Sequence, residues 1–165
     1  MVEPAITALT EQLKKLGNAS SLHSAGRAAR KDLEQAREII AEAIDCAPSE
    51  VVFTSTGTEA NNLAVRGLYW QGVKSNKKVI ITSTFEHHAV ADPINWLAEH
   101  EGAQVVRIGV DRDGFIDLVE LKEKVNEHKN NIALISIMHS NNEVGTLQDI
   151  DQVVKIAGNI PVHSD

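Results

Sequence analysis

The stretch VIITSTFEHHAVADPINWLAEHEGAQVVRIGV, residues 79–110, decides the predicted fold. It begins with the apolar run Val79–Ile81, continues through a helical pattern over 88–100, and ends in a second apolar run, Val105–Val110. Runs that are rich in Val and Ile, with little alternation, are typical of strands covered on both faces. A strand, a helix and a second strand in this order predict a parallel pair joined by a crossover helix.

The same alternation extends outward in both directions. Further apolar runs lie at Val51–Phe53, Ile132–Met138 and Ile160–Val162, and further helical patterns lie near 59–70, 117–127 and 149–157. We therefore expect an α/β fold with three layers, a mainly parallel sheet flanked by helices. Because such sheets bind ligands at the carboxyl ends of their strands, the residues after each apolar run are the candidates for a site.

The chain before Pro48 has a different character. Pro4 opens an amphipathic pattern that stops at Gly17, which predicts a short helix. A longer helix is predicted from Ser24, with an apolar stripe that we expect to be buried: Ala25, Ala29, Leu33, Ala36, Ile40 and Ile44. The predicted organisation is one domain over 1–165, with N-terminal helices over 1–46 and the α/β part over 47–165.

Composition excludes several classes of protein. The 165 residues are 42% hydrophobic and 24% charged, as in a chain with a real core. A net charge of -7 argues against a nucleic-acid or acidic-membrane partner, which would need a basic face. No apolar stretch approaches the roughly 20 residues of a membrane span, and the N-terminus does not resemble a secretory signal. Cys46, the single cysteine, cannot form an internal disulfide, so a cytoplasmic protein is expected.

A possible phosphate site follows the first of the apolar runs in the chain. The residues TSTGTE (54–59) lead directly into a helical pattern. Gly57 lets backbone amides approach an anion, the helix start offers unpaired N–H donors, and Thr58 adds a hydroxyl. The plainer interpretation is an ordinary helix cap made by Thr56 or Thr58.

His87 follows the run Val79–Ile81. An imidazole at a strand end can lie against a heteroaromatic ring, or exchange a proton near neutral pH. The alternative is that Glu86 caps the next helix while the histidines are surface residues. A metal site is not expected, because His87 and His88 are adjacent and point apart.

Asn142 and Asp165 follow the last two apolar runs. The paired asparagines before Gly145 form either a tight turn or an amide donor for a phenolic oxygen. A carboxylate at Asp165 can pair with a pyridinium nitrogen and keep it protonated. At about 4 Å in a partly buried site, such a pair is on the order of 4 kcal/mol before the cost of desolvation.

Several segments resemble, in order, those of a known family. They are GNASSLHSAGRAAR (17–30), FTSTGTEANNLAVRG (53–67), TSTFEHHAV (82–90), HSNNEVGTLQDI (139–150) and PVHSD (161–165). Their sequences are similar to those of cysteine desulfurases. These enzymes belong to the class V aminotransferase group of fold-type I enzymes, which use pyridoxal 5'-phosphate. The resemblance implies a partial large domain of the pyridoxal-phosphate-dependent transferase fold.

The resemblance also implies a role for each candidate residue. Gly57 and Thr58 would hold the cofactor phosphate, and Asn142 would bond the phenolic oxygen of the ring. Asp165 would pair with the ring nitrogen. His87 would stack on the ring and act as a catalytic residue by moving protons. The implied reaction takes sulfur from L-cysteine, giving alanine and an enzyme persulfide for iron–sulfur cluster or thio-cofactor synthesis. A homodimer and protein sulfur acceptors are implied partners.

Three family features are expected outside these residues. The opening strand of the family would precede Val2. The Ser-x-His-Lys segment with the Schiff-base lysine, and the persulfide-forming cysteine, would follow Asp165. Cys46 is not at the position of the catalytic thiol. We therefore expect a truncated family member that is inactive alone. The alternatives are a non-catalytic scaffold of the same fold, or a selenocysteine lyase or other class V enzyme.

Overall fold

The computed structural model describes every residue from Met1 to Asp165, and its contacts divide the chain between Phe53 and Thr54. The single domain over 1–165, with its parts 1–46 and 47–165, stays a prediction. None of the helices in either unit combines the length and apolar character that a membrane span requires.

The unit Met1–Phe53 is helical. It contains α1 (Glu3–Leu13), α2 (Ser24–Ala43) and the short 3-10 helix η1 (Pro48–Glu50). An ion pair joins the segment that follows α1 to α2, with Nζ of Lys15 at 2.8 Å from Oδ2 of Asp32. Both helices that the sequence predicts are present, but the first ends at Leu13 and not at the predicted stop, Gly17.

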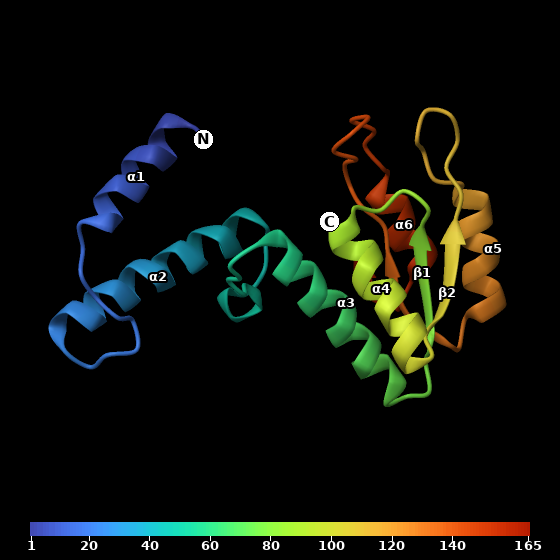
Figure 1. Cartoon of the computed structure of the whole chain (residues 1–165), viewed down its shortest axis with the longest axis horizontal. Helices are drawn as coiled ribbons and strands as arrows, with labels where there is room; N and C mark the ends of the chain where they lie inside the picture. Colours follow the sequence, from blue (N-terminus) through green and yellow to red (C-terminus); the bar gives the residue numbers. More distant parts are fainter. The chain divides into compact units, whose positions relative to one another are not determined.

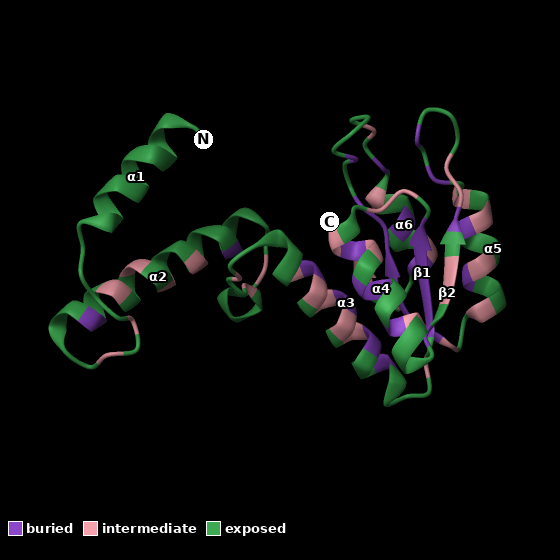
Figure 2. Ribbon diagram, viewed as in Figure 1, coloured by how far each residue is buried: buried purple, intermediate pink, exposed green.

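The expected buried stripe on α2 is wrong. Leu33 and Ile40 are each 39% exposed, and Ile44 is 65% exposed. Figure 2 shows most of α1 and α2 as exposed surface. Within this unit α2 can pack only against α1 and the short η1. Most of the apolar side chains on α2 therefore have no core to enter.

The unit Thr54–Asp165 contains a parallel sheet, as predicted. Its strands are β1 (Val79–Ser83), β2 (Gln104–Ile108), β3 (Ile132–Ser136) and β4 (Val162–His163). They lie in the order β2-β1-β3-β4, and every neighbouring pair is parallel. The helices between and before them are α3 (Gly57–Val73), α4 (His88–Glu101), α5 (Leu118–His128) and α6 (Ile150–Ala157).

Helices cover both faces of this sheet, which gives the three layers that were expected (Figure 1). Successive strand residues point to opposite faces, so neighbours in β1 enter different cores. Ile80 packs with Val65 of α3 and Leu97 of α4. Ile81 packs on the other face with Leu121 of α5 and Val153 of α6.

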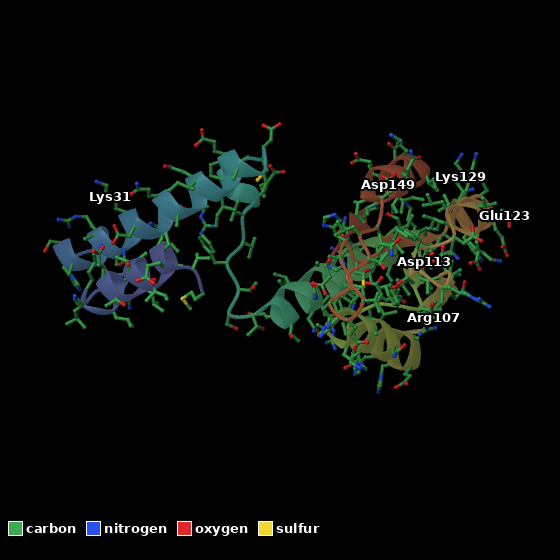
Figure 3. All side chains as sticks on the ribbon, turned by 90° about the horizontal axis from the view of Figure 1, so that it is seen from above. Lys31, Arg107, Asp113, Glu123, Lys129 and Asp149 are labelled. Carbon is green, nitrogen blue, oxygen red and sulfur yellow. The ribbon has the colours of Figure 1, made fainter.

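Polar side chains stand on the outside of this unit and at the helix starts. Figure 3 labels Glu123 and Lys129, both exposed, and Asp149 at the beginning of α6. Asp149 caps that helix, because its Oδ1 accepts a hydrogen bond from the backbone N–H of Gln152 at 3.0 Å. The boundary predicted for this helix, 149–157, is thus confirmed to within its cap.

One predicted strand is absent. Val51–Phe53 has no strand pairing, and the carbonyl oxygen of Val51 accepts instead from the guanidinium of Arg37. A strand needs a neighbour for its backbone groups, and these residues have none beside them. The other apolar runs form strands with somewhat different ends, since β2 stops at Ile108, β3 stops at Ser136 and β4 begins at Val162.

The connections between the strands create a topological switch point at the carboxyl ends of the sheet. The chain leaves β1 for β2 on one side, and then crosses back past β1 to form β3 on the other side. Parallel sheets bind ligands where the strand order reverses in this way, beyond the carboxyl ends of the strands. Here that point lies between β1 and β3, next to the end of β4.

Candidate functional site

An open cavity of about 430 Å³ lies at this switch point. The residues that line it are Gly57, Thr58, Asn61, His87, Ala89, Met138, Ser140, Asn142 and Asp165. The structure therefore brings together all five residues that the sequence singled out. It adds Asn61, Ala89, Met138 and Ser140, which sequence reasoning missed.

A larger hollow, of about 710 Å³, lies within the N-terminal unit between α2 and the segment Pro48–Phe53. Its charged groups are engaged with one another, because Nε of Arg37 lies 3.1 Å from Oε2 of Glu34. The guanidinium also lies 4.9 Å from the ring of Phe53. In the smaller cavity, Nε2 of His87 and the side-chain carboxylate of Asp165 have no hydrogen-bond partner in the protein and are free to bind a ligand. We therefore identify the smaller cavity as the candidate functional site.

The beginning of α3 forms one wall of the cavity. Thr56 caps the helix, since its Oγ1 accepts from the backbone N–H of Glu59 at 3.1 Å, and its carbonyl accepts from Ala60. The backbone N–H groups of Gly57 and Thr58 have no partner in the protein. A Cβ placed on Gly57 would meet nothing within 4 Å. The capping interpretation is thus correct for Thr56, and two donors at the positive end of the helix still face open space.

His87 forms another part of the wall. It is itself the N-cap of α4, because its Nδ1 accepts from the backbone N–H of Ala89 at 3.0 Å. When the ring is neutral, the proton must therefore be on Nε2. Both His87 and His88 are exposed, as the alternative interpretation expected, but the cap of this helix is His87 and not Glu86.

Glu86 instead joins the ends of two strands. Its Oε1 accepts from Oγ of Ser83 at 2.6 Å and from the backbone N–H of Met138 at 3.0 Å. Burial raises the pKa of Glu86, these two bonds oppose that rise, and the carboxylate of Asp165 adds to it. Oε2 of Glu86 is sealed from water without a partner. This carboxyl group fixes the segments that carry His87 and Met138.

The two asparagines after β3 do different things. Asn141 is 6% exposed, and its Oδ1 accepts from the backbone N–H groups of Glu143 and Val144 at 2.9 and 3.0 Å. Its Nδ2 donates to the carbonyl of Phe85 at 3.3 Å. Asn141 thus closes the turn, whereas Asn142 is exposed and lines the cavity. The tight turn and the amide at the site are both present, on different residues.

Asp165 is fixed through its backbone. Its carbonyl oxygen accepts from the N–H of His139 at 3.0 Å, which continues the pairing of β3 and β4 beyond the strands. Figure 1 shows this end of the chain near the beginning of α4, and His87, the N-cap of that helix, lines the same cavity as Asp165. The cavity thus combines two backbone donors, an imidazole, an amide and a carboxylate.

Comparison with known proteins identifies the family. The model of the aminotransferase class-V family matches residues 1–164. This chain belongs to the aminotransferase class-V family. It is 46% identical over 165 residues to the IscS-like cysteine desulfurase of Mycobacterium tuberculosis (strain ATCC 25618 / H37Rv), a match that covers 98% of this chain and 42% of the relative.

Solved structures place this class-V chain among the same relatives. A NifS-like protein superposes with a TM-score of 0.90 at 33% identity, over 100% of this chain and 45% of the other. A structure described as SspA in complex with cysteine gives a TM-score of 0.89 at 33% identity, over 100% and 47%. The resemblance to cysteine desulfurases is confirmed, and the chain spans less than half the length of these relatives.

Proposed function

We propose that this chain forms the cofactor-binding part of a pyridoxal-phosphate-dependent cysteine desulfurase. The observation that carries the proposal is the single cavity into which Thr58, His87, Asn142 and Asp165 converge. The similarity to cysteine desulfurases supports the same assignment. The proposal includes removal of sulfur from L-cysteine to give alanine and an enzyme persulfide.

The groups in the cavity fit pyridoxal 5'-phosphate. The unpaired N–H groups of Gly57 and Thr58 suit a phosphate at a helix start. His87 offers an imidazole face to the ring, Asn142 an amide to its phenolic oxygen, and Asp165 a carboxylate to its nitrogen. When bound, this cofactor acts as an electron sink for the bonds to the α-carbon of an amino-acid substrate.

The hydrogen bonds of His87 limit how it can move a proton. Because Nδ1 accepts from Ala89, proton exchange with a ligand must occur at Nε2. The neutral ring donates there, and it becomes an acceptor at Nε2 only if Nδ1 takes the proton and the bond to Ala89 is lost. The start of α4 therefore influences the proton transfer that we propose for His87.

Substrate and partners come to this chain by analogy. A relative of known structure is described as a complex with cysteine, which supports L-cysteine as the substrate. Delivery of the sulfur to acceptor proteins, for iron–sulfur cluster or thio-cofactor synthesis, belongs to the same proposal. A homodimer and a cytoplasmic location stay predictions.

Titration with pyridoxal 5'-phosphate, followed by its absorbance, tests the proposal. We expect saturable binding of one equivalent per chain. His87→Ala and Asp165→Asn should each weaken binding about tenfold or more, because each removes an interaction of roughly 1–3 kcal/mol. His88→Ala is the matched control and should bind like the wild type, since His88 does not line this cavity.

The scaffold alternative has one observation in its favour, which is that the residues lining the cavity include no lysine. Borohydride reduction followed by peptide mapping addresses it, because reduction would fix the cofactor to any lysine that holds it. For these 165 residues we expect reversible binding with no lysine preferentially labelled. Absence of any saturable binding would instead favour the scaffold. Because the chain is expected to be inactive alone, the lyase alternative is tested by comparing how tightly the cofactor-loaded chain binds L-cysteine and L-selenocysteine.

A further inference from the structure

Asn61 is a buried polar residue in the wall of the cavity. It is 5% exposed and lies on α3 one turn beyond Gly57, at the spacing that puts both residues on the same face of the helix. Asn62, the next residue, is half-buried and donates from Nδ2 to the carbonyl of Thr58 at 3.0 Å. The two neighbouring amides therefore have different surroundings, and only Asn61 lines the cavity.

A chain of hydrogen bonds from the sheet reaches Asn61. Oγ of Ser136, a fully buried residue at the end of β3, lies 2.8 Å from Nδ1 of His163 in β4. Nε2 of the same imidazole lies 3.2 Å from Oδ1 of Asn61. Because an amide oxygen only accepts, Nε2 carries the proton in this arrangement, and in the neutral ring Nδ1 accepts from the serine hydroxyl.

These two hydrogen bonds determine which end of the Asn61 side-chain amide is free. With Oδ1 held by His163, the Nδ2 group of Asn61 points the other way, and no protein group accepts from it. Nδ2 is also not among the polar atoms that are sealed from water without a partner. The small exposed fraction of Asn61 thus includes an N–H donor, on a residue that lines the cavity together with Asp165.

We propose that Asn61 is a further ligand-binding residue of this site, whose Nδ2 donates to an acceptor oxygen of the bound cofactor, with His163 and Ser136 as positioning residues that orient the amide. The proposal rests on the proposed function, because it assumes that the cavity takes a phosphorylated pyridine. The acceptor is an oxygen either of the phosphate or of the ring. Inorganic phosphate and pyridoxal, used as separate probes, distinguish the two.

The first test compares two isosteric substitutions on the same helix. Asn61→Asp keeps the shape and the acceptor for His163 but removes the Nδ2 donor. Asn62→Asp adds the same charge one residue further on. We expect Asn61→Asp to bind pyridoxal 5'-phosphate about tenfold more weakly than Asn62→Asp. Equal affinities of the two variants would overturn the proposal, since charge alone would then explain both.

The second test examines the positioning role of His163. His163→Gln keeps an N–H donor for Oδ1 of Asn61, whereas His163→Leu removes it. We expect the glutamine variant to retain most of the affinity and the leucine variant to lose about as much as Asn61→Asp. Equal loss in the two variants, with both folded by circular dichroism, would contradict the positioning role.

The third test observes the amide directly in the wild-type chain. The side-chain ¹H–¹⁵N signals of Asn61, assigned by their absence in Asn61→Asp, should shift when pyridoxal 5'-phosphate binds. A shift with inorganic phosphate alone identifies a phosphate oxygen as the acceptor, and a shift with pyridoxal alone identifies a ring oxygen. If the cofactor binds and the signals do not move, only this inference fails. If the cofactor does not bind at all, the proposed function fails with it.

Discussion

Two half-buried titratable side chains, Glu86 and His163, form hydrogen bonds to residues that line the site, and desolvation shifts their pKa values in opposite directions. The pKa of the Glu86 carboxyl is raised and that of the His163 imidazole is lowered, so in both cases the neutral form is favoured. Each side chain also forms hydrogen bonds to other segments of the unit: Glu86 to Met138, just after β3, and His163 to Ser136 of β3 and Asn61 of α3. Their protonation therefore affects the stability of the whole edge of the sheet.

Replacing Glu86 by glutamine should change how stability depends on pH. The folded pKa lies above the unfolded value of about 4.5, so the wild type loses stability as the pH rises from that value through the folded pKa. Glu86→Gln has no charge to bury, and its Oε1 can still accept from Ser83. Denaturant titrations should show the variant gaining relative to the wild type across this pH range. A difference that does not vary with pH would contradict the account.

His163 should show the opposite dependence. Its folded pKa lies below the unfolded value of 6.5 because of burial, and the carboxylate of Asp165 opposes that shift. The stability that it contributes is present above pH 6.5 and is lost as the pH falls from there through the folded pKa. An NMR titration of the ring should give a midpoint below 6.5, and a midpoint above that value would show that the imidazole is not desolvated.

At this scale the sequence predicted the residues that follow strands and missed those that depend on packing. His87, Asn142 and Asp165 come directly after apolar runs, so their position at the carboxyl edge follows from topology alone. Asn61 lies inside a helix, where an asparagine is usually a surface residue. Its burial arises because β4 brings His163 against α3, a contact between residues 102 positions apart.

The packing of α3 on the sheet depends on one close contact. A Cβ on Gly72 would lie 2.6 Å from Cβ and 3.0 Å from Cα of Ala133 in β3. These are shorter than normal contacts, so the helix and the strand approach each other only because this residue has no side chain. Since the same helix begins at Gly57, its position on β3 also determines where the two free N–H donors lie.

Gly72→Ala should therefore destabilise the protein by about 1–3 kcal/mol through overpacking, and it should also weaken cofactor binding. Gly67→Ala is the matched control on the same helix, because a Cβ there meets nothing within 4 Å. Alanine at that position should raise stability by up to about 1 kcal/mol. Urea denaturation measures both changes, and a neutral Gly72→Ala would refute the importance of the contact.

Elements were predictable where local pattern and tertiary partner agree. The runs around Ile80 and Ile135 form strands because neighbouring strands pair with their backbone groups and helices cover their side chains on both faces. Val51–Phe53 has the same apolar character, but its backbone has no neighbouring strand, so it is not one. A sequence pattern reports what a segment can bury, whereas pairing depends on what lies beside it.

The core of the molecule is unevenly distributed between its two units. Ala41 is the single buried apolar residue of Met1–Phe53, whereas every residue of β1 and of β3 is buried. Figure 2 shows this contrast between α1 and α2 on one hand and β1 on the other. Because burial of apolar surface is the main source of stability, the two units should differ in local unfolding.

Amide hydrogen exchange should show this difference. We expect slow exchange for β1 and β3 and fast exchange for α1 and α2, whose apolar side chains are largely exposed. The comparison is internal, so both units are measured in one sample. Protection of α2 equal to that of β1 would mean that the N-terminal helices are covered in solution, for example by a second copy of the chain.

A crystal structure of this chain with pyridoxal 5'-phosphate tests the central claim most directly. We expect density for the phosphate at the N–H groups of Gly57 and Thr58, with the ring in contact with His87, Asn142 and Asp165. Cofactor density elsewhere on the molecule, in crystals of protein that binds the cofactor in solution, would contradict the claim that these strand ends form its site.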